Sequence, residues 1–162
     1  YMPAYARDDD VLLCVNRAGI VGLTPPDFHI RRYESYRYGV VHCVTRGKGC
    51  VTVRGREHRV GKGQLFVLGP GEPHEYASAV DDPMGLCWVE FYGANSPDML
   101  RLILSGGVVY GGGAFDAALT MLTQIIMRLE KPMQAAEISV LLYQLLVTAG
   151  GERARVHAAI SP

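Results

Sequence analysis

The sequence has no excess of charge of either sign, because sixteen Lys and Arg residues balance sixteen Asp and Glu residues over 162 positions. A chain that holds nucleic acid by neutralising phosphates needs a surplus of basic side chains, so we do not expect this chain to bind DNA strongly by itself. It also has no apolar run near the roughly 20 residues of a membrane span. The segment Val11–Val15 is too short for a signal-peptide core. We therefore expect a cytoplasmic protein with no membrane partner.

Several chemical signatures are missing as well. The four cysteines, which include no C-x-x-C pair, match neither a zinc ribbon nor a dense disulfide scaffold. We interpret them as buried thiols in a reducing compartment. The sequence has no G-x-S-x-G nucleophile elbow, no P-loop and no G-x-G-x-x-G dinucleotide fingerprint. We therefore expect neither an enzyme nor a bound cofactor.

The composition that is present predicts one globular domain, with 49% hydrophobic and 20% charged residues. Seventeen of the 19 glycines precede residue 114, where short runs rich in Val, Ile, Tyr and Phe alternate with turn residues, as in a β-barrel or sandwich. Arg46–Gly49 and Gly55-Arg56 predict tight reversals between consecutive hairpins, and Pro70–Pro73 predicts a turn at the rim. The predicted strands cover residues 11–15, 18–23, 27–33, 37–46, 49–54, 56–60, 64–68, 74–78 and 84–92.

From Ala114 onward, apolar residues recur every three or four positions, which predicts two amphipathic helices. The first ends near Lys131-Pro132, and the second begins near Gln134 and is stopped by Gly150-Gly151. A shorter helix is expected over 96–104, with Ser96 as its N-cap. The apolar face of the last helix is broad, so we expect it to pack on the preceding helix and also on a second copy of the chain. Packing within one chain is the alternative. The residues predicted at this dimer interface are Ile138, Leu141, Leu142, Leu145 and Leu146.

The strand 84–92 has two different faces. Its odd-numbered core positions are uniformly apolar, which suits packing against helices. On the other face, Leu86 and Trp88, the only tryptophan, accompany Glu90. An aromatic wall with a few polar groups is typical of a pocket for a small polar molecule.

A second pattern of this kind lies in the strand 27–33, where one of two adjacent arginines must share a face with Ile30. A buried Arg32 would require an anionic or hydrogen-bonding partner. Alternatively, Arg32 lies at the strand end and extends to water.

The histidines do not have the spacing of a metal site. A metal-binding barrel usually brings two histidines one residue apart on a strand, then a carboxylate, then a third histidine after a Pro-Gly turn. Here His42 has no paired histidine, and only Pro70–His74 matches the last part of the pattern. We predict no metal. The alternative is a small metal-dependent enzyme, an isomerase or dioxygenase, that uses His42, His74 and Glu90 around one ion.

Several short motifs follow one another in a particular order: TRGKG at 45–49, GKGQLFVL at 61–68, PGEPHEY at 70–76, DP at 82–83 and WVEFYG at 88–93. In this order and spacing, the chain from about Gly19 through the terminal helices resembles the N-terminal domain of AraC-family transcription regulators. The resemblance implies a mainly β fold with C-terminal helices, in which a cupin-like, jelly-roll barrel without a catalytic metal encloses an effector, often a sugar. Two antiparallel helices would then form a dimer contact.

The resemblance also implies how the chain is divided. Residues 1–10 would form an arm over the mouth of the barrel, 11–94 the effector-binding barrel, 95–151 the helical dimerisation region, and 152–162 a tail toward a separate DNA-binding domain with helix-turn-helix units. Tyr1 precedes Met2, and the chain stops at Pro162 without a closing element. We therefore expect a longer native protein that binds DNA only through the absent domain.

Residue by residue, the resemblance implies a set of effector contacts. Positions that contact the sugar in the family match Thr24, Arg32, Tyr76 and Trp88, and Ile30 shares the face of Arg32. Leu86 stands where the sugar-binding pattern has a histidine, which removes a hydrogen-bonding group and argues for a sugar or glycoside other than arabinose. The implied function is effector sensing and dimerisation in a transcription regulator. A pure dimerisation module, whose barrel is closed by large side chains, is a third interpretation.

Overall fold

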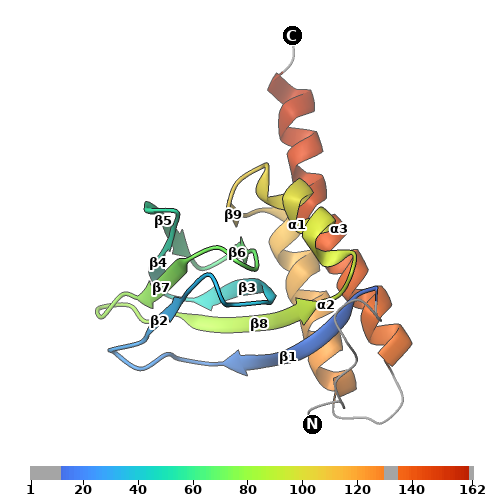
Figure 1. Ribbon diagram of the computed structural model, residues 1–162. Coiled ribbons are helices and arrows are strands. Elements are labelled where there is room, and N and C mark those ends of the chain that lie inside the picture. The colour runs from blue at the N-terminus through green and yellow to red at the C-terminus, as the bar shows by residue number, and fades with distance from the viewer. Residues whose placement is uncertain (1–11, 130–134, 161–162) are drawn as a thin grey trace.

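The computed structural model describes residues 12–129 and 135–160, and it consists of two antiparallel sheets and three helices in the C-terminal part of the chain (Figure 1). The predicted arm, residues 1–10, lies outside the described residues. The mainly β prediction with C-terminal helices is confirmed. The strands are β1 Cys14–Val21, β2 His29–Arg32, β3 Gly39–Arg46, β4 Lys48–Val53, β5 Arg56–Gly61, β6 Gln64–Leu68, β7 His74–Ser78, β8 Gly85–Tyr92 and β9 Val109–Tyr110.

The strands form a five-stranded sheet in the order β1-β8-β3-β6-β9 and a four-stranded sheet in the order β2-β7-β4-β5. The strands predicted over 11–15 and 18–23 form a single strand, β1, which continues through a bulge between Val15 and Arg17 in its pairing with β8. The short strand β9 was not predicted. It pairs with the edge of β6.

The reversal between β3 and β4 differs from the expected hairpin. These two strands lie in different sheets, and the chain crosses between them at Gly47, which has a φ of 67°. A Cβ there would lie 2.1 Å from the carbonyl oxygen of Pro83, so only glycine fits this crossing. The hairpin between β4 and β5 is confirmed. Its turn at Arg54-Gly55 has positive φ at both residues, as the preferred two-residue hairpin turns require.

The helices are α1 Ser96–Leu104, α2 Gly113–Leu129 and α3 Ala135–Ile160. The short helix over 96–104 is confirmed, although its N-cap is Asn95 and not Ser96, whose hydroxyl donates to the carbonyl of Gly93 at 2.9 Å. Within the described parts of the chain, no helix has the length and apolar character needed to cross a membrane.

The expected stop of the last helix at Gly150-Gly151 is wrong, because α3 continues to Ile160 and so includes most of the predicted tail. A glycine inside a helix costs about 1 kcal/mol. Gly150 packs against Ile103 of α1, and a Cβ at Gly150 would lie 3.2 Å from that side chain. Close packing between the helices therefore offsets the weak local propensity, and the end of α3 projects beyond the sheets (Figure 1).

The five-stranded sheet separates two cores. One lies between this sheet and the helices and contains Cys43, Leu65, Val89 and Phe91, with Leu142 of α3. The other lies between the two sheets. The alternation predicted for the strand 84–92 is confirmed, because its odd positions face the helices and its even positions face the space between the sheets.

Candidate ligand-binding site

The middle layer of the space between the sheets is aromatic, and His42 of β3 lies at its centre. The imidazole stacks on Phe66 at 4.7 Å between ring centroids, with an interplanar angle of 23°. It also lies 4.9 Å from the ring of Tyr76 and 6.2 Å from that of Trp88. The register explains this convergence, because Phe66 and Trp88 are the residues directly opposite His42 on β6 and β8.

Neither ring nitrogen of His42 has a hydrogen-bond partner among the described residues, although the residue is only 4% exposed. Burial, followed by the effects of His74 and the charge of Arg32, lowers the pKa of His42 to about 3. The ring is therefore neutral at physiological pH. A neutral imidazole offers one donor and one acceptor, and buried polar groups are normally satisfied. His42 is thus a hydrogen-bonding group that the fold itself leaves unused.

Glu90 of β8 is the buried carboxylate at one end of this space, and its oxygens have several partners. Arg17 of β1 binds it through two nitrogens, with Nη2 to Oε1 at 2.8 Å, and Asn16 Nδ2 donates to Oε2 at 3.1 Å. The Tyr36 hydroxyl also donates to Oε1. Burial alone would raise the pKa of Glu90, but the hydrogen bonds from Arg17 and Tyr36 outweigh it and hold the pKa below its usual value.

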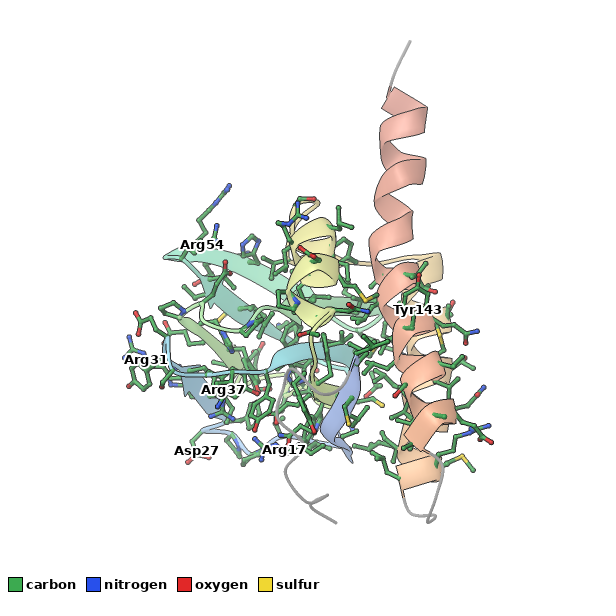
Figure 2. All side chains as sticks on the ribbon, turned by 45° about the vertical axis from the view of Figure 1, so that its right-hand side comes forward. Arg17, Asp27, Arg31, Arg37, Arg54 and Tyr143 are labelled. Carbon is green, nitrogen blue, oxygen red and sulfur yellow. The ribbon has the colours of Figure 1, made fainter. Side chains whose placement is uncertain are left out.

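Arg32 ends β2 close to this cluster, and its guanidinium lies 5.0 Å from the centroid of the Tyr36 ring. The side chain is half-buried. Its positive charge contributes to the lowered pKa values of His42 and His74, after the larger effect of burial. Arg31 lies on the opposite face of β2, pairs with Glu75 at 3.6 Å, and projects outward (Figure 2). Alternation therefore directs Arg32, and not Arg31, toward the space between the sheets.

A protein-family model for the AraC-like ligand-binding domain matches residues 23–146. The chain belongs to this AraC-like family. Among solved structures, it is similar to the AraC-like transcriptional activator CuxR, with a TM-score of 0.54 and 12% identity over 78% of this chain and 48% of CuxR. The chain therefore spans about half the length of that protein. This likeness confirms the fold of the AraC-like domain.

The chain is also similar to cupin domains over part of its length. The cupin domain of Schizosaccharomyces pombe Cnp3 has a TM-score of 0.42 and 20% identity over 52% of this chain and 60% of its own. A cupin 2 conserved barrel protein from Salinispora arenicola has a TM-score of 0.38 and 15% identity over 51% of this chain and 65% of its own. No curated protein sequence matches the chain.

Five of the six residues predicted to contact the effector come together in the AraC-like domain. Tyr76 is 8% exposed, and Trp88 and Ile30 are half-buried in the same cluster. Arg32 lies two residues after Ile30 in β2, so the two share one face of the strand. Leu86 lies in this cluster too, two residues along β8 from Trp88, and is 1% exposed. These side chains therefore lie together between the two sheets.

Thr24 lies apart from the other five. It is buried in the connection between β1 and β2, its hydroxyl is hydrogen-bonded to that of Ser78 at 2.7 Å, and its backbone N–H donates to Met84. Met84 precedes β8, at the end of the space opposite to Glu90. The Thr24 hydroxyl therefore has a structural partner in the turn, and Thr24 is separated from Arg32 along the barrel.

The proposed trio for a metal-dependent enzyme does not converge. His74 Nδ1 is hydrogen-bonded to the backbone carbonyl of Glu72 at 2.8 Å, while Glu90 binds Arg17 and Tyr36. Over the described ranges, no three His, Cys, Asp or Glu side chains lie together in a way that could hold a metal ion. The four cysteines are free thiols, as expected, but Cys14 and Cys50 are only half-buried.

The residues predicted at the dimer interface are instead used within one chain. Ile138, Leu142, Leu145 and Leu146 are buried in the core that α3 shares with the five-stranded sheet and the other helices, and Leu141 packs against that core. The apolar side chains that α3 leaves exposed are Val140, Tyr143 and Val147. Sequence periodicity identified an apolar helix correctly but assigned its inner face to the partner.

Other functional candidates were not predicted from the sequence. Phe66 could have been found from its even position in β6, which alternation directs inward. Arg17 is recognisable only from the pairing of β1 with β8, which places it opposite Glu90. Tyr36 lies in the connection between β2 and β3 and has no periodic signal.

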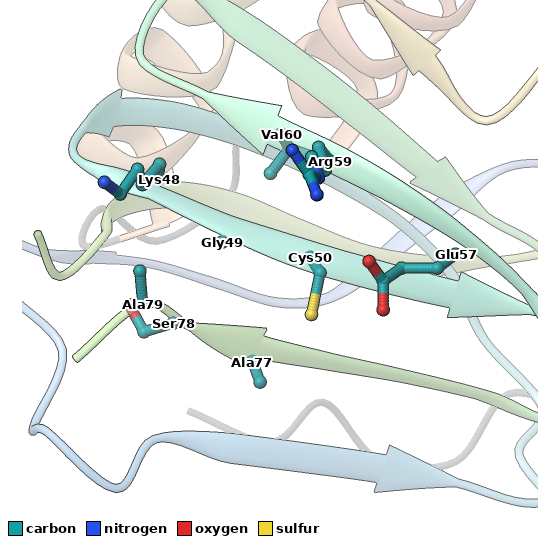
Figure 3. A pocket seen from close by; sticks show the side chains of 9 residues that line it. All are labelled: Lys48, Gly49, Cys50, Glu57, Arg59, Val60, Ala77, Ser78 and Ala79. Atoms are coloured by element: carbon teal, nitrogen blue, oxygen red, sulfur yellow. The ribbon is translucent and has the colours of Figure 1, made fainter. Parts of the chain in front are cut away.

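A shallow groove of about 360 Å³ lies on the outer face of the four-stranded sheet (Figure 3). Cys50 of β4 lies there between Ala77 of β7 and Arg59 of β5, its register partners. Lys48, Glu57 and Arg59 place charges of both signs around it. None of the residues predicted to contact an effector lines this groove.

Proposed function

We propose that this AraC-like domain senses a small effector, a sugar or glycoside, held between its two sheets, and that it has no enzymatic activity. The observation that carries the proposal is that the ring nitrogens of His42, beside Tyr76 and Trp88 in the interior, have no hydrogen-bond partner among the described residues. A ligand site commonly combines aromatic walls with a few placed polar groups. The fold supplies both here.

Trp88 would provide the apolar platform for a sugar ring. The residue opposite it on β1 is Gly19, where a Cβ would lie 3.2 Å from the indole. The missing side chain lets the indole lie over β1, and Arg17 lies 5.9 Å from its centroid on that strand. In the proposed complex, Trp88 stacks on the sugar while Arg32, Tyr76 and His42 offer hydrogen bonds to its polar groups.

The regulatory part of the proposal requires a second copy of the chain. The exposed residues Val140, Tyr143 and Val147 follow one another at three- and four-residue spacing, so they form one stripe along α3. They are 57%, 56% and 50% exposed. We place the dimer contact on this stripe, and control of DNA through a domain outside this chain. A cytoplasmic location agrees with four free thiols.

Tryptophan fluorescence tests the proposed pocket, because Trp88 is the only indole. The purified chain is titrated with pentoses, hexoses and their glycosides. We expect a saturable change with one sugar or a few related ones, and its loss in Tyr76→Ala. The absence of a saturable change with every member would contradict a sugar effector, while a change that survives in Tyr76→Ala would contradict this pocket.

A further inference from the structure

The charges between the two sheets do not balance. Arg17 and Arg32 are both directed at this space, whereas Glu90 is its buried carboxylate. Glu90 is already bound by Arg17 through two nitrogens, by Tyr36 and by Asn16. Both oxygens of Glu90 therefore already accept hydrogen bonds from these groups. The charge of Arg32 is left without a counterion in the cluster.

Arg32 has no carboxylate within 4.0 Å in the described part of the chain. The neighbouring Arg31 has Glu75 at 3.6 Å on the outer face of the same strand. The two side chains thus form an internal comparison: the exposed arginine has an acidic partner, and the half-buried one has the ring of Tyr36. Tyr36 itself is fixed by its bond to Glu90, which keeps its ring under the guanidinium.

Among the described residues, the other polar groups around Arg32 supply no negative charge. Burial lowers the pKa values of His42 and His74, and the charge of Arg32 adds to this effect, so both rings are neutral near pH 7. Burial also raises the pKa of Tyr76 to about 12, so its hydroxyl keeps its proton. A partly desolvated guanidinium gains most from an anion, because its planar fork matches the two oxygens of a carboxylate or phosphate.

We propose that the effector is an anionic sugar derivative whose carboxylate or phosphate pairs with Arg32 while one of its hydroxyls binds a ring nitrogen of His42. This inference rests on the proposed function and narrows its ligand class. It uses the charge of Arg32, which has no acidic partner among the described residues, and the neutral ring of His42, whose nitrogens have no hydrogen-bond partner there. No other charged group in the cluster needs to change partner when the ligand binds.

Matched sugars provide the test. D-glucose is compared with D-glucuronate and D-glucose 6-phosphate, and D-galactose with D-galacturonate and D-galactose 6-phosphate, at constant ionic strength. The readouts are Trp88 fluorescence and the thermal midpoint of the 162-residue chain. We expect a charged member to bind about tenfold more tightly than its neutral counterpart, the usual order for a charged hydrogen bond. The uronate and phosphate arms identify which acidic group the site takes.

Three variants separate the inference from the proposed function. Arg32→Gln should abolish the preference for the charged sugar, whereas the matched control Arg31→Gln should keep it. Arg32→Lys retains the charge and should keep part of the preference, which distinguishes charge recognition from misfolding. The inference is overturned if the neutral and charged sugars bind with equal affinity, or if the preference for the charged sugar survives in Arg32→Gln. The proposed sugar-sensing function would still stand in either case. No binding in either the neutral or the charged arms contradicts the sugar-sensing function itself.

Discussion

The two faces of the five-stranded sheet are built from the same strands but differ in chemistry. On the face toward the helices, Cys43, Leu65, Val89 and Phe91 pack with side chains of the helices in one apolar core. The alternate positions on those strands face the second sheet and include His42 and Glu90, which are both buried. One face therefore contains only groups that gain from burial, and the other contains groups that burial destabilises unless they are paired.

Under the proposed function, the helix-facing side maintains the fold and the inner side binds the ligand. The polar groups of the inner face fall into two kinds. Glu90 is fully paired by Arg17, Tyr36 and Asn16 and holds three elements together. His42 is unpaired and Arg32 has no acidic neighbour in the described structure. Unpaired polar groups in a packed interior do not stabilise a fold, so they are the ones we assign to binding.

The largest loss of stability is expected from a substitution on the helix-facing side of the five-stranded sheet. Phe91 is fully buried against α1, so Phe91→Ala should lower the free energy of unfolding by roughly 4 kcal/mol through lost burial and a cavity. Urea denaturation measures this loss. The fraction that stays folded should bind the effector with unchanged affinity. A large fall in affinity without a fall in stability would show that the two faces are not separate in function.

Glu90→Gln should have the next largest effect, a loss of about 2 kcal/mol, because Arg17 and Tyr36 lose a buried charged acceptor. The hydrogen bonds of Glu90 hold its folded pKa below the usual 4.5. Its contribution is therefore complete above that pH and is lost as the pH falls through the folded pKa. Denaturation of both proteins from pH 7 to pH 3 should show the difference shrinking on the acid side. A constant difference would contradict this assignment.

The smallest effect on stability is expected at the exposed stripe of α3. Tyr143→Arg should change the unfolding free energy of a single chain by less than about 0.5 kcal/mol, because the side chain is exposed (Figure 2). It should nevertheless weaken self-association, which sedimentation velocity measures. Gln144→Arg, at an exposed position one residue along α3, is the matched control and should leave association unchanged. Equal self-association of the unchanged protein, Tyr143→Arg and Gln144→Arg would contradict the proposed dimer contact.

Predictions from the sequence were correct where a sequence pattern is compatible with a single structural arrangement. Alternation in the strand 84–92 predicted that Trp88 and Glu90 face inward and that Val89 and Phe91 face the helices, because strand periodicity leaves no third choice. The order of the motifs predicted the family and its fold. The clustering of Tyr76, Trp88 and Leu86 between the sheets follows from the same two sources.

Sequence reasoning failed where one local pattern is compatible with several tertiary arrangements. A glycine turn at Gly47 suits a hairpin and a crossing between sheets equally well, and only the approach of Pro83 distinguishes them. The apolar face of α3 has the same period whether it packs inside the chain or on a partner, so Leu142 was assigned to the wrong neighbour. Tyr36 reaches Glu90 from a connection between strands, where no period exists.

The most direct test of the division between the two faces is His42→Phe, with unfolding free energy and effector affinity measured on the same preparation. Phenylalanine keeps a planar aromatic ring, somewhat larger than imidazole, that can stack on Phe66 without any polar atom to desolvate. His58→Phe on β5 controls for the same exchange elsewhere in the barrel. We predict that stability stays constant or rises by up to about 1 kcal/mol while affinity falls about tenfold. A loss of stability with unchanged affinity would show that His42 serves the fold and would contradict the account.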